Sequence, residues 1–167
     1  MATVREQSNT NAQKPAKTAR IRHIAIACDD PERTANLYAD AFGLEKRYKV
    51  DEAFATGWEL TDGHISVAIL KFSDEYLKAH DGDLGDKFRP GFTGLHHIGF
   101  HVDDKDQAVE TLREYGAYPL TAINDFLEER KGESNYAADG KGKDELKMRG
   151  LEGECFEVCQ VDWTVGE

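Results

Sequence analysis

The sequence lacks any hydrophobic run long enough to cross a lipid bilayer. Its longest apolar stretches, such as Ile24–Cys28 and Val67–Leu70, fall far short of the roughly 20 residues that a membrane-spanning helix needs. The N-terminal stretch Met1–Arg20 is polar and has no apolar segment of the kind found in secretory signals. We therefore expect no membrane partner, a disordered arm over residues 1–20 and a cytoplasmic location.

Positive charge is also scarce in this chain. Lys and Arg total 21 against 32 Asp and Glu, which gives a formal net charge of −11. Such a surface repels the phosphate backbone of nucleic acids and anionic lipid headgroups. The composition therefore argues against nucleic acid as a partner.

Cysteine is rare as well, with three residues in the chain. Cys155 and Cys159 are four positions apart, so on one strand they would lie roughly 13 Å from each other. That separation forbids a disulfide between them, because bonded Cα atoms lie within about 7 Å. Free thiols suit a reducing compartment, although the sequence leaves open a pairing of Cys28 elsewhere.

An internal repeat organises the rest of the chain. Ile21–Asp30 is an alternating segment that carries His23, and the pattern returns 74 positions later as Leu95–Asp104 with His97. Alternation of this kind predicts strands with one apolar face. Each segment is followed by a helix-like stretch that stops at a glycine, as a left-handed cap requires. These stretches are Pro31–Phe42 before Gly43 and Lys105–Tyr115 before Gly116.

Three further strand candidates follow each glycine. In the first unit they are Lys46–Val50, Thr56–Thr61 and His64–Phe72, with Asp62-Gly63 as a hairpin turn; in the second they are Tyr118–Ile123, Glu145–Arg149 and Glu154–Val161. The fold we predict is therefore α+β, with two βαβββ modules forming a cup-shaped mixed sheet and helices outside. A single domain spans 21–163, with module one at 21–72, a linker at 73–93 and module two at 94–163. A polar insertion at Asn124–Asp144 is long enough to act as a mobile cover.

The repeat places two histidines at the same register. A pseudo-twofold axis would bring His23 and His97 together on the concave face of the sheet. On the last strand Glu157 lies on the face opposite to Phe156 and Val158, so its carboxylate is directed to the same side. These three side chains are the candidate ligands of a divalent metal ion.

These motifs resemble the vicinal oxygen chelate superfamily, which includes glyoxalases, bleomycin-binding proteins and extradiol dioxygenases. The resemblance extends from about Arg20 to Trp163 and is carried by Ile21–Asp30, the helix end at Phe42-Gly43-Leu44, Gly94–Phe100 and Gly153–Val158. It implies a homodimer with a metal ion in the cup, held by His23, His97 and Glu157. The ion would be Fe, Ni, Zn, Mn or Co.

One departure from the family pattern bears on mechanism. Related enzymes usually take a fourth ligand from the last strand of the first module, where this chain turns His64, Ser66 and Ala68 to the cup. Ser66 and Ala68 are poor metal ligands and His64 lies beside the turn, so they favour an open coordination site. Two histidines and one carboxylate with open positions are also the arrangement of extradiol dioxygenases.

The resemblance leaves several functions open. The favoured one is a metal-dependent enzyme that chelates adjacent oxygens of a small-molecule substrate, of dioxygenase or glyoxalase-like lyase or isomerase type. The alternative is a metal-free protein that sequesters a small molecule. Candidate substrate-binding residues are Ser66, Ala68, His101 and Arg149, and Lys147 is a further candidate for contact with an anionic substrate. His101 and Tyr136 are candidates for acid-base chemistry, and no catalytic residue is assigned.

Overall fold

The computed structural model describes residues 19–84, 88–130 and 144–161. The first module contains β1 (Arg20–Ala27), α1 (Pro31–Phe42), β2 (Glu45–Asp51), β3 (Ala55–Thr61) and β4 (Ser66–Phe72). α2 (Asp74–Leu84) lies in the connection between the modules. The second module contains β5 (Gly94–His101), α3 (Lys105–Glu114), β6 (Tyr118–Pro119), α4 (Thr121–Glu129), β7 (Leu146–Arg149) and β8 (Cys155–Cys159).

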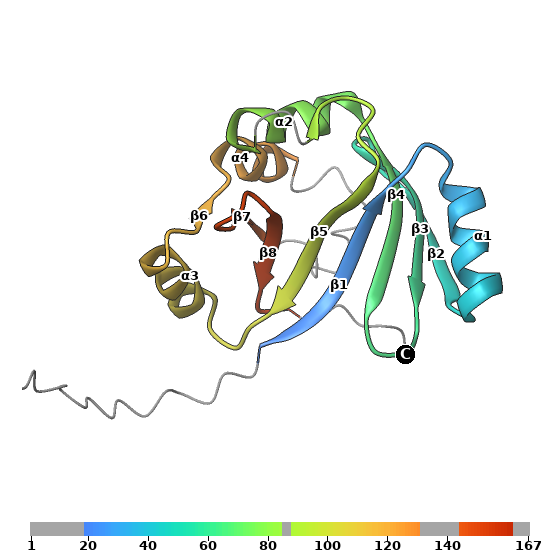
Figure 1. Cartoon of the computed structure of the whole chain (residues 1–167), viewed down its shortest axis with the longest axis horizontal. Helices are drawn as coiled ribbons and strands as arrows, with labels where there is room; N and C mark the ends of the chain where they lie inside the picture. The colour runs from blue at the N-terminus through green and yellow to red at the C-terminus, as the bar shows by residue number, and fades with distance from the viewer. Residues whose placement is uncertain (1–18, 85–87, 131–143, 162–167) are drawn as a thin grey trace, which may run out of the picture.

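The strands form one mixed sheet whose two halves have the same internal order. The order is β2-β3-β4-β1-β5-β8-β7-β6, and the modules meet where β1 pairs antiparallel with β5. In each half the first strand pairs parallel with the last, β1 with β4 and β5 with β8. The sheet curls without closing (Figure 1). This arrangement confirms the predicted α+β fold of paired modules.

Equivalent aspartates cap the first helix of each module. The Asp30 carboxylate accepts a hydrogen bond from the backbone N–H of Arg33, and Asp104 accepts one from Gln107 in the same way. α1 then packs its apolar face on the convex side of β3 and β4, and α3 packs against β8. Both helices therefore lie outside the cup, as the repeat predicted. None of the described helices is long and apolar enough to cross a membrane.

Two helices were not predicted. The segment expected as a linker contains α2, and the strand expected at Tyr118–Ile123 ends after two residues and is followed by α4. Pro119 has no N–H to donate, and Ile123, Phe126 and Leu127 recur at helical spacing, so a strand over this segment was the wrong prediction. The part of the expected cover at 131–143 lies outside the described residues, as does Tyr136.

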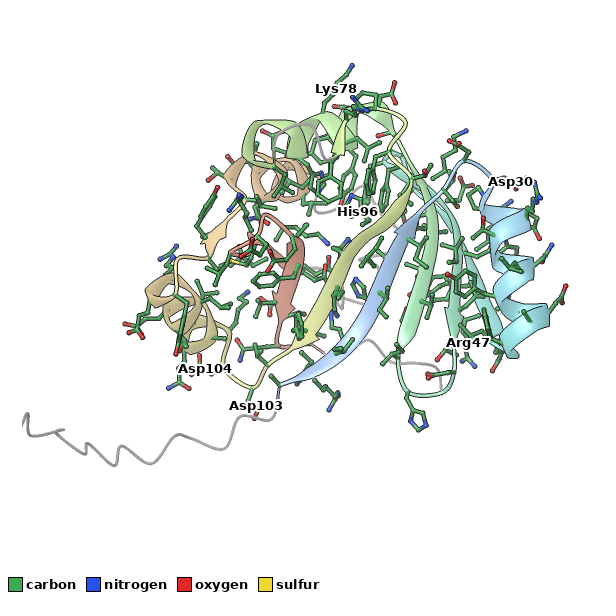
Figure 2. All side chains as sticks on the ribbon, viewed as in Figure 1. Asp30, Arg47, Lys78, His96, Asp103 and Asp104 are labelled. Atoms are coloured by element: carbon green, nitrogen blue, oxygen red, sulfur yellow. The ribbon has the colours of Figure 1, made fainter. Side chains whose placement is uncertain are left out.

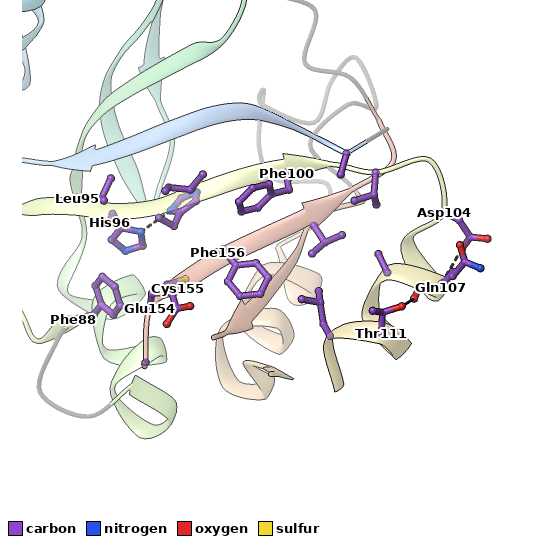
Figure 3. A pocket seen from close by; sticks show the side chains of 18 of the residues that line it. Phe88, Leu95, His96, Phe100, Asp104, Gln107, Thr111, Glu154, Cys155 and Phe156 are labelled. Carbon is purple, nitrogen blue, oxygen red and sulfur yellow. Dashed lines mark hydrogen bonds between the residues drawn. The ribbon is translucent and has the colours of Figure 1, made fainter. Parts of the chain in front are cut away.

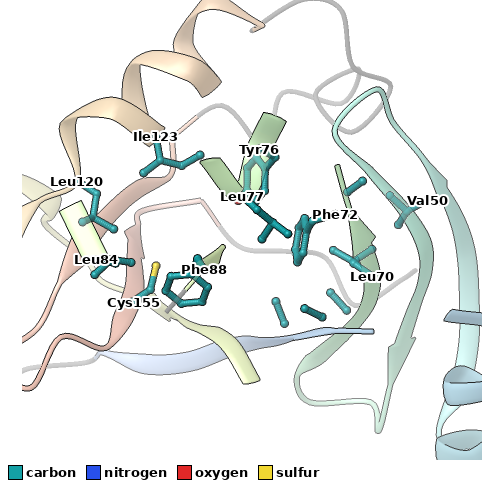
Figure 4. Packing of buried hydrophobic residues seen from close by; sticks show 14 residues of the cluster. Val50, Leu70, Phe72, Tyr76, Leu77, Leu84, Phe88, Leu120, Ile123 and Cys155 are labelled. Carbon is teal, nitrogen blue, oxygen red and sulfur yellow. The ribbon is translucent and has the colours of Figure 1, made fainter. Parts of the chain in front are cut away.

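α2 and α4 pack together and close one end of the concave face of the sheet (Figure 1). The largest cluster of buried apolar side chains lies beneath them (Figure 4). It joins Tyr76 and Leu77 of α2 and Ile123 of α4 to the concave face of β4, where Leu70 and Phe72 lie. The concave face is thus dry and packed at this end, while polar side chains gather further along β1 and β5. Cys28, Cys155 and Cys159 are all free thiols.

Candidate metal centre

A β-bulge lies beside each of the two histidines. In β1 the pairing with β5 shifts between Ile21 and His23, which leaves Arg22 as the extra residue. In β5 the shift lies between Leu95 and His97, where His96 is the extra residue. A bulge places two successive side chains opposite one partner residue, so alternation is lost at that point. Arg22 and His23 are consequently both buried, as are His96 and His97.

A glycine between two strands lets His23 meet Glu157. Gly99 of β5 pairs with His23 on one side and with Glu157 of β8 on the other. A Cβ at Gly99 would lie 2.7 Å from Glu157 Oε1 and 3.0 Å from His23 Nδ1. The absent side chain therefore makes the room in which the imidazole and the carboxylate come into contact.

The structure brings His23, His97 and Glu157 together. His23 Nε2 lies 2.9 Å from His97 Nε2, and His97 Nε2 lies 3.4 Å from Glu157 Oε2. One ligand atom from each of the three residues can be chosen so that all lie within 4.8 Å of one another. Ligand atoms on one ion are about 3.0–3.4 Å apart when each bond is near 2.1 Å. The spacing fits a divalent metal ion.

The protonation of the two imidazoles supports the same conclusion. His23 Nδ1 lies 3.2 Å from Glu157 Oε1, and the neutral ring that suits this carboxylate has its proton on Nδ1 and a lone pair on Nε2. Lys147 Nζ lies 2.9 Å from His97 Nε2, and because an ammonium only donates, this nitrogen also carries a lone pair. With both rings in this tautomer neither Nε2 atom can donate to the other across the 2.9 Å that separates them, and the lone pair of His97 Nε2 accepts from Lys147. A cation that replaced this ammonium would meet both lone pairs.

Two basic side chains share the carboxylate of Glu157. Arg22 Nη2 lies 2.6 Å from Glu157 Oε1 and 2.6 Å from Glu145 Oε1. Lys147 Nζ donates to Glu157 Oε2 and lies 3.8 Å from Glu145 Oε2. The four side chains carry two positive and two negative charges, so they neutralise one another. In this structure the ammonium of Lys147 contacts two of the three candidate ligands.

Burial and these charges set the protonation states at the site. Burial lowers the pKa of His23 well below its usual value, and burial together with Lys147 lowers the pKa of His97 to about 4. For Glu157, burial acts to raise the pKa, but His23, Lys147 and Arg22 outweigh it and hold the pKa well below its usual range. At neutral pH the site therefore offers two neutral imidazoles and one ionised carboxylate, which are the forms that bind metal.

The pseudo-twofold axis identifies where a fourth ligand is missing. Glu157 of β8 pairs with Gly99 of β5, and the equivalent pair in module one is Ala68 of β4 with Ala25 of β1. The neighbour of Glu157 on β7 is Lys147, and the neighbour of Ala68 on β3 is Glu59. An alanine thus stands at the fourth-ligand position, and a carboxyl group lies on the next strand.

Glu59 and Ser66 form a polar patch beside the three candidate ligands. Glu59 is 6% exposed and Ser66 is 4% exposed, and Ser66 Oγ has no hydrogen-bond partner among the described residues. Burial, reinforced by the charge of Glu145, raises the pKa of Glu59 to about 8. The carboxyl group of Glu59 is therefore largely protonated at neutral pH. Ser66 pairs with His23, so this patch adjoins the ligands.

The other candidate residues lie at different places. Ala68 is buried on the concave face near Glu59. His101 is near the end of β5, where its Nε2 donates to the backbone carbonyl of Gln160. Arg149 donates to the carbonyl of Gly150 and lies over the ring of Tyr118. His64 is exposed in the turn between β3 and β4.

Sequence reasoning missed Arg22, His96, Glu59 and Glu145. Strict alternation places Arg22 and His96 on the convex face, and only the bulges turn them inward. Glu59 has a signal that could have been used, because it alternates with Trp58 and Leu60, which pack under α1. A lone carboxylate on the concave face of a strand between apolar neighbours is an indication of a buried polar site.

A groove of about 930 Å³ lies on the face of β5 that carries Ile98 and Phe100, and it reaches His96 and His97 at one end. Its walls are mostly apolar side chains of β5, β8 and α3, including Leu95, Phe100 and Phe156. In Figure 3 His96, Phe88 and Cys155 lie at one end of the groove, and Asp104 and Gln107 of the α3 region lie at the other.

Comparison with known proteins defines the class. The model of the Glyoxalase/Bleomycin resistance protein/Dioxygenase superfamily matches residues 22–133, and the chain belongs to this superfamily. The match includes His23 and His97 and ends before Glu157.

Individual relatives are more distant. The uncharacterized protein YwkD of Bacillus subtilis (strain 168) is 29% identical over 100 residues, which cover 58% of this chain and 71% of that protein. The hypothetical protein BH1468 of Bacillus halodurans C-125 has a similar structure, with a TM-score of 0.61 and 16% identity over 90% of this chain and 100% of that chain. Methylmalonyl-CoA epimerase from Mycobacterium tuberculosis has a TM-score of 0.50 and 14% identity, over 83% of this chain and 85% of its own. These structures are similar to this chain in fold.

Proposed function

We propose that this chain is an enzyme that binds a divalent metal ion through His23, His97 and Glu157 and acts on a small molecule with adjacent oxygen atoms. The observation that carries the proposal is the convergence of the three side chains: His23 Nε2 and His97 Nε2 lie 2.9 Å apart, and one ligand atom from each of the three residues lies within 4.8 Å of the others. Membership of a superfamily that includes glyoxalases and dioxygenases supports it. When bound, the ion supplies Lewis-acid polarisation of the substrate oxygens.

Binding of the ion requires Lys147 to move. Its ammonium contacts His97 Nε2 and Glu157 Oε2, the atoms that face the proposed ion. Glu145 Oε2, at 3.8 Å from Lys147 Nζ, is the acceptor towards which the ammonium can turn. Arg22 keeps its contact with Glu157 Oε1, so the carboxylate stays oriented through its other oxygen.

The charges at the site indicate an anionic substrate. Arg22 and Lys147 together balance Glu145 and Glu157, so a divalent ion would add two positive charges to a neutral, buried group. Charge that is buried and uncompensated is costly, and an oxyanion that chelates the ion would neutralise it. A carboxylate or diolate next to a second oxygen is the substrate class that fits.

Glu59 favours isomerase or lyase chemistry over ring-opening oxygenation. A carboxyl group whose pKa is raised to about 8 can both donate and accept a proton near neutral pH. Such a group on the open side of the ligands suits a reaction in which a carbon acid gives up and regains a proton. We propose Glu59 as the proton-transfer residue and Ser66 as a hydrogen-bond donor to the substrate.

A metal-free binding protein is the second candidate, because Lys147 already occupies the position between His97 and Glu157. In that case the ammonium itself would hold an anionic ligand. The homodimer implied by the family resemblance and the cytoplasmic location expected from the sequence stay predictions under either function.

Substitution of Lys147 distinguishes the two candidates. If a metal ion binds, Lys147→Met removes a competing cation, and Zn²⁺ affinity measured by titration calorimetry on chelator-treated protein should rise about tenfold or more. Lys71→Met, on the exposed side of β4, is the matched control and should leave Zn²⁺ affinity unchanged. Loss of all Zn²⁺ binding in the wild-type chain and in Lys147→Met would favour the metal-free function.

A further inference from the structure

A row of three buried histidines leads from α2 to the metal centre. His97 Nδ1 lies 2.7 Å from His96 Nδ1, and the rings of His96 and His80 lie edge to face with centroids 5.0 Å apart. His80 is 0% exposed, His96 2% and His97 5%. Figure 2 shows His96 beneath the helices that close the end of the sheet.

The inner end of the row has a defined tautomer. Lys147 donates to His97 Nε2, so the ring proton of neutral His97 is on Nδ1. This Nδ1–H can only be the donor in the 2.7 Å contact, and His96 Nδ1 is the acceptor. The ring proton of neutral His96 is therefore on Nε2.

The outer end of the row is defined by the backbone. His80 Nδ1 lies 3.0 Å from the carbonyl oxygen of Tyr76, one helical turn earlier, and a carbonyl only accepts. His80 therefore carries its proton on Nδ1 and a lone pair on Nε2. The donor at His96 Nε2 and the acceptor at His80 Nε2 are complementary.

These two nitrogens are also the buried atoms of the row that lack a partner. His80 Nε2 and His96 Nε2 have no hydrogen-bond partner within the residues that the structure describes. Phe72, Tyr76 and Phe88 pack around them, so phenylalanine at either position would satisfy packing alone. A water molecule that accepts from His96 Nε2 and donates to His80 Nε2 would satisfy both groups and leave the contacts of both Nδ1 atoms in place.

We propose that His80, His96 and His97 form a hydrogen-bonded chain that holds the imidazole of His97 in the tautomer whose Nε2 lone pair faces the metal ion. The proposal rests on the proposed function, in which His97 is a ligand. His96 and His80 are positioning residues, because they act on the ion only through His97. Arg22, at the bulge position equivalent to His96, orients Glu157 in the same manner.

The test combines Zn²⁺ titration of the chelator-treated full chain with NMR of ¹⁵N-histidine-labelled protein. His96→Phe keeps the ring but removes the acceptor, and we expect Zn²⁺ affinity to fall about 10–100-fold. His96→Asn places an amide oxygen at the same distance along the side chain as Nδ1, and it should restore most of that loss. His80→Phe should cause a smaller loss than His96→Phe. Long-range ¹H–¹⁵N spectra of the apo wild-type chain should show His97 protonated on Nδ1.

Unchanged Zn²⁺ affinity in His96→Phe, or a His97 proton on Nε2 in the apo protein, would overturn the proposal while leaving the metal site intact. A wild-type chain with the Nδ1 tautomer that binds no Zn²⁺ would instead overturn the proposed function. If His96→Phe does not fold, His80→Phe and the wild-type spectrum decide the matter: equal Zn²⁺ affinity in His80→Phe and the wild type, or a His97 proton on Nε2, contradicts the chain of histidines.

Discussion

Gly99 is the residue on which the geometry of the site depends most directly. Its neighbours across the sheet are His23 and Glu157, and they meet in the space that a side chain at this position would fill. The equivalent residue in module one is Ala25, which has a methyl group and no carboxylate beside it. The two modules therefore differ here because the carboxylate ligand, Glu157, comes from the second module alone.

We predict that Gly99→Ala weakens both metal binding and the fold. The new Cβ would lie 2.7 Å from Glu157 Oε1, so the carboxylate or the ring of His23 must move. Zn²⁺ affinity should fall about tenfold or more, with a loss of about 1–3 kcal/mol in the free energy of unfolding from overpacking. Calorimetric titration and urea unfolding measure both, and unchanged Zn²⁺ affinity would contradict the described contact.

Glu157→Gln tests the charge balance of the site in the absence of metal. Glu157 is 0% exposed and contacts both Arg22 and Lys147, so its neutralisation leaves buried positive charge without enough compensation. We expect the metal-free protein to lose about 3–5 kcal/mol of unfolding free energy. Glu154→Gln, on an exposed residue three positions earlier, is the control and should change stability by less than about 0.5 kcal/mol. Equal effects in both variants would show that β8 is in another register.

Glu59 should make stability depend on pH. Its pKa is raised from 4.5 to about 8 in the folded chain, so the folded state binds more protons than the unfolded state between these values. The contribution of Glu59 to stability is present below about pH 4.5 and is lost as pH rises, by about 1.4 kcal/mol per unit. Glu59→Gln removes this loss. In chelator-treated protein, the free energy of unfolding of Glu59→Gln relative to that of the wild type should therefore increase from about pH 5.5 to about pH 7.5. A constant difference in urea unfolding across this range would contradict the assignment.

At the scale of elements, the two modules begin in the same way. Asp30 caps α1 and Asp104 caps α3, each through a hydrogen bond to the backbone N–H three residues later. Asp30→Ala and Asp104→Ala should each cost about 1 kcal/mol of unfolding free energy. The sites lie in different modules, so the double variant should lose the sum of the two values within about 0.5 kcal/mol in thermal or urea unfolding. A loss at only one position would show that the repeat is not equivalent in its caps.

The elements that could be predicted from sequence are those with a complete local signal. β1 and β5 show alternation, and α1 and α3 have an aspartate cap and a terminating glycine. The bounds of both helices lie within one residue of the prediction, whereas each strand ends three residues before the end of the predicted alternating segment. α2 and α4 could not be derived from the repeat, because they occupy the connection and an insertion that have no counterpart in the other module. Tyr118–Ile123 was misjudged because its apolar residues suit a strand until Pro119 and the helical spacing after it are weighed.

The same distinction separates the residues of the site. His23, His97 and Glu157 could be predicted because register and alternation determine the face on which a strand residue lies. Arg22 and His96 could not, because a bulge reverses that face and leaves no mark in the sequence. Glu59 lies on β3, and its place beside the ligands depends on the pairing of β4 with β1, which exists only once the sheet has formed. Lys147 was singled out from the sequence, but as a contact for an anionic substrate and not as the neighbour of Glu157.

At the scale of the whole molecule, the two modules join at β1 and β5, and the candidate ligands come from both halves of the sheet. His23 belongs to module one, while His97 and Glu157 belong to module two. A metal ion that bridges them would link the modules, so it should stabilise the folded chain as any ligand of the native state does. Saturating Zn²⁺ should therefore raise the melting temperature of the wild-type chain but not that of Glu157→Gln, measured by scanning calorimetry with and without chelator.

The central claim, that His23, His97 and Glu157 bind one divalent ion, is tested most directly by the metal content of the purified chain. Mass spectrometry of metals, on protein prepared without chelator and reconstituted with Zn²⁺, should give about one ion per chain. His23→Gln and His97→Gln should each reduce this to background with the far-ultraviolet circular dichroism retained. Absence of metal in the wild-type chain, or equal metal in the folded variants, would contradict the account.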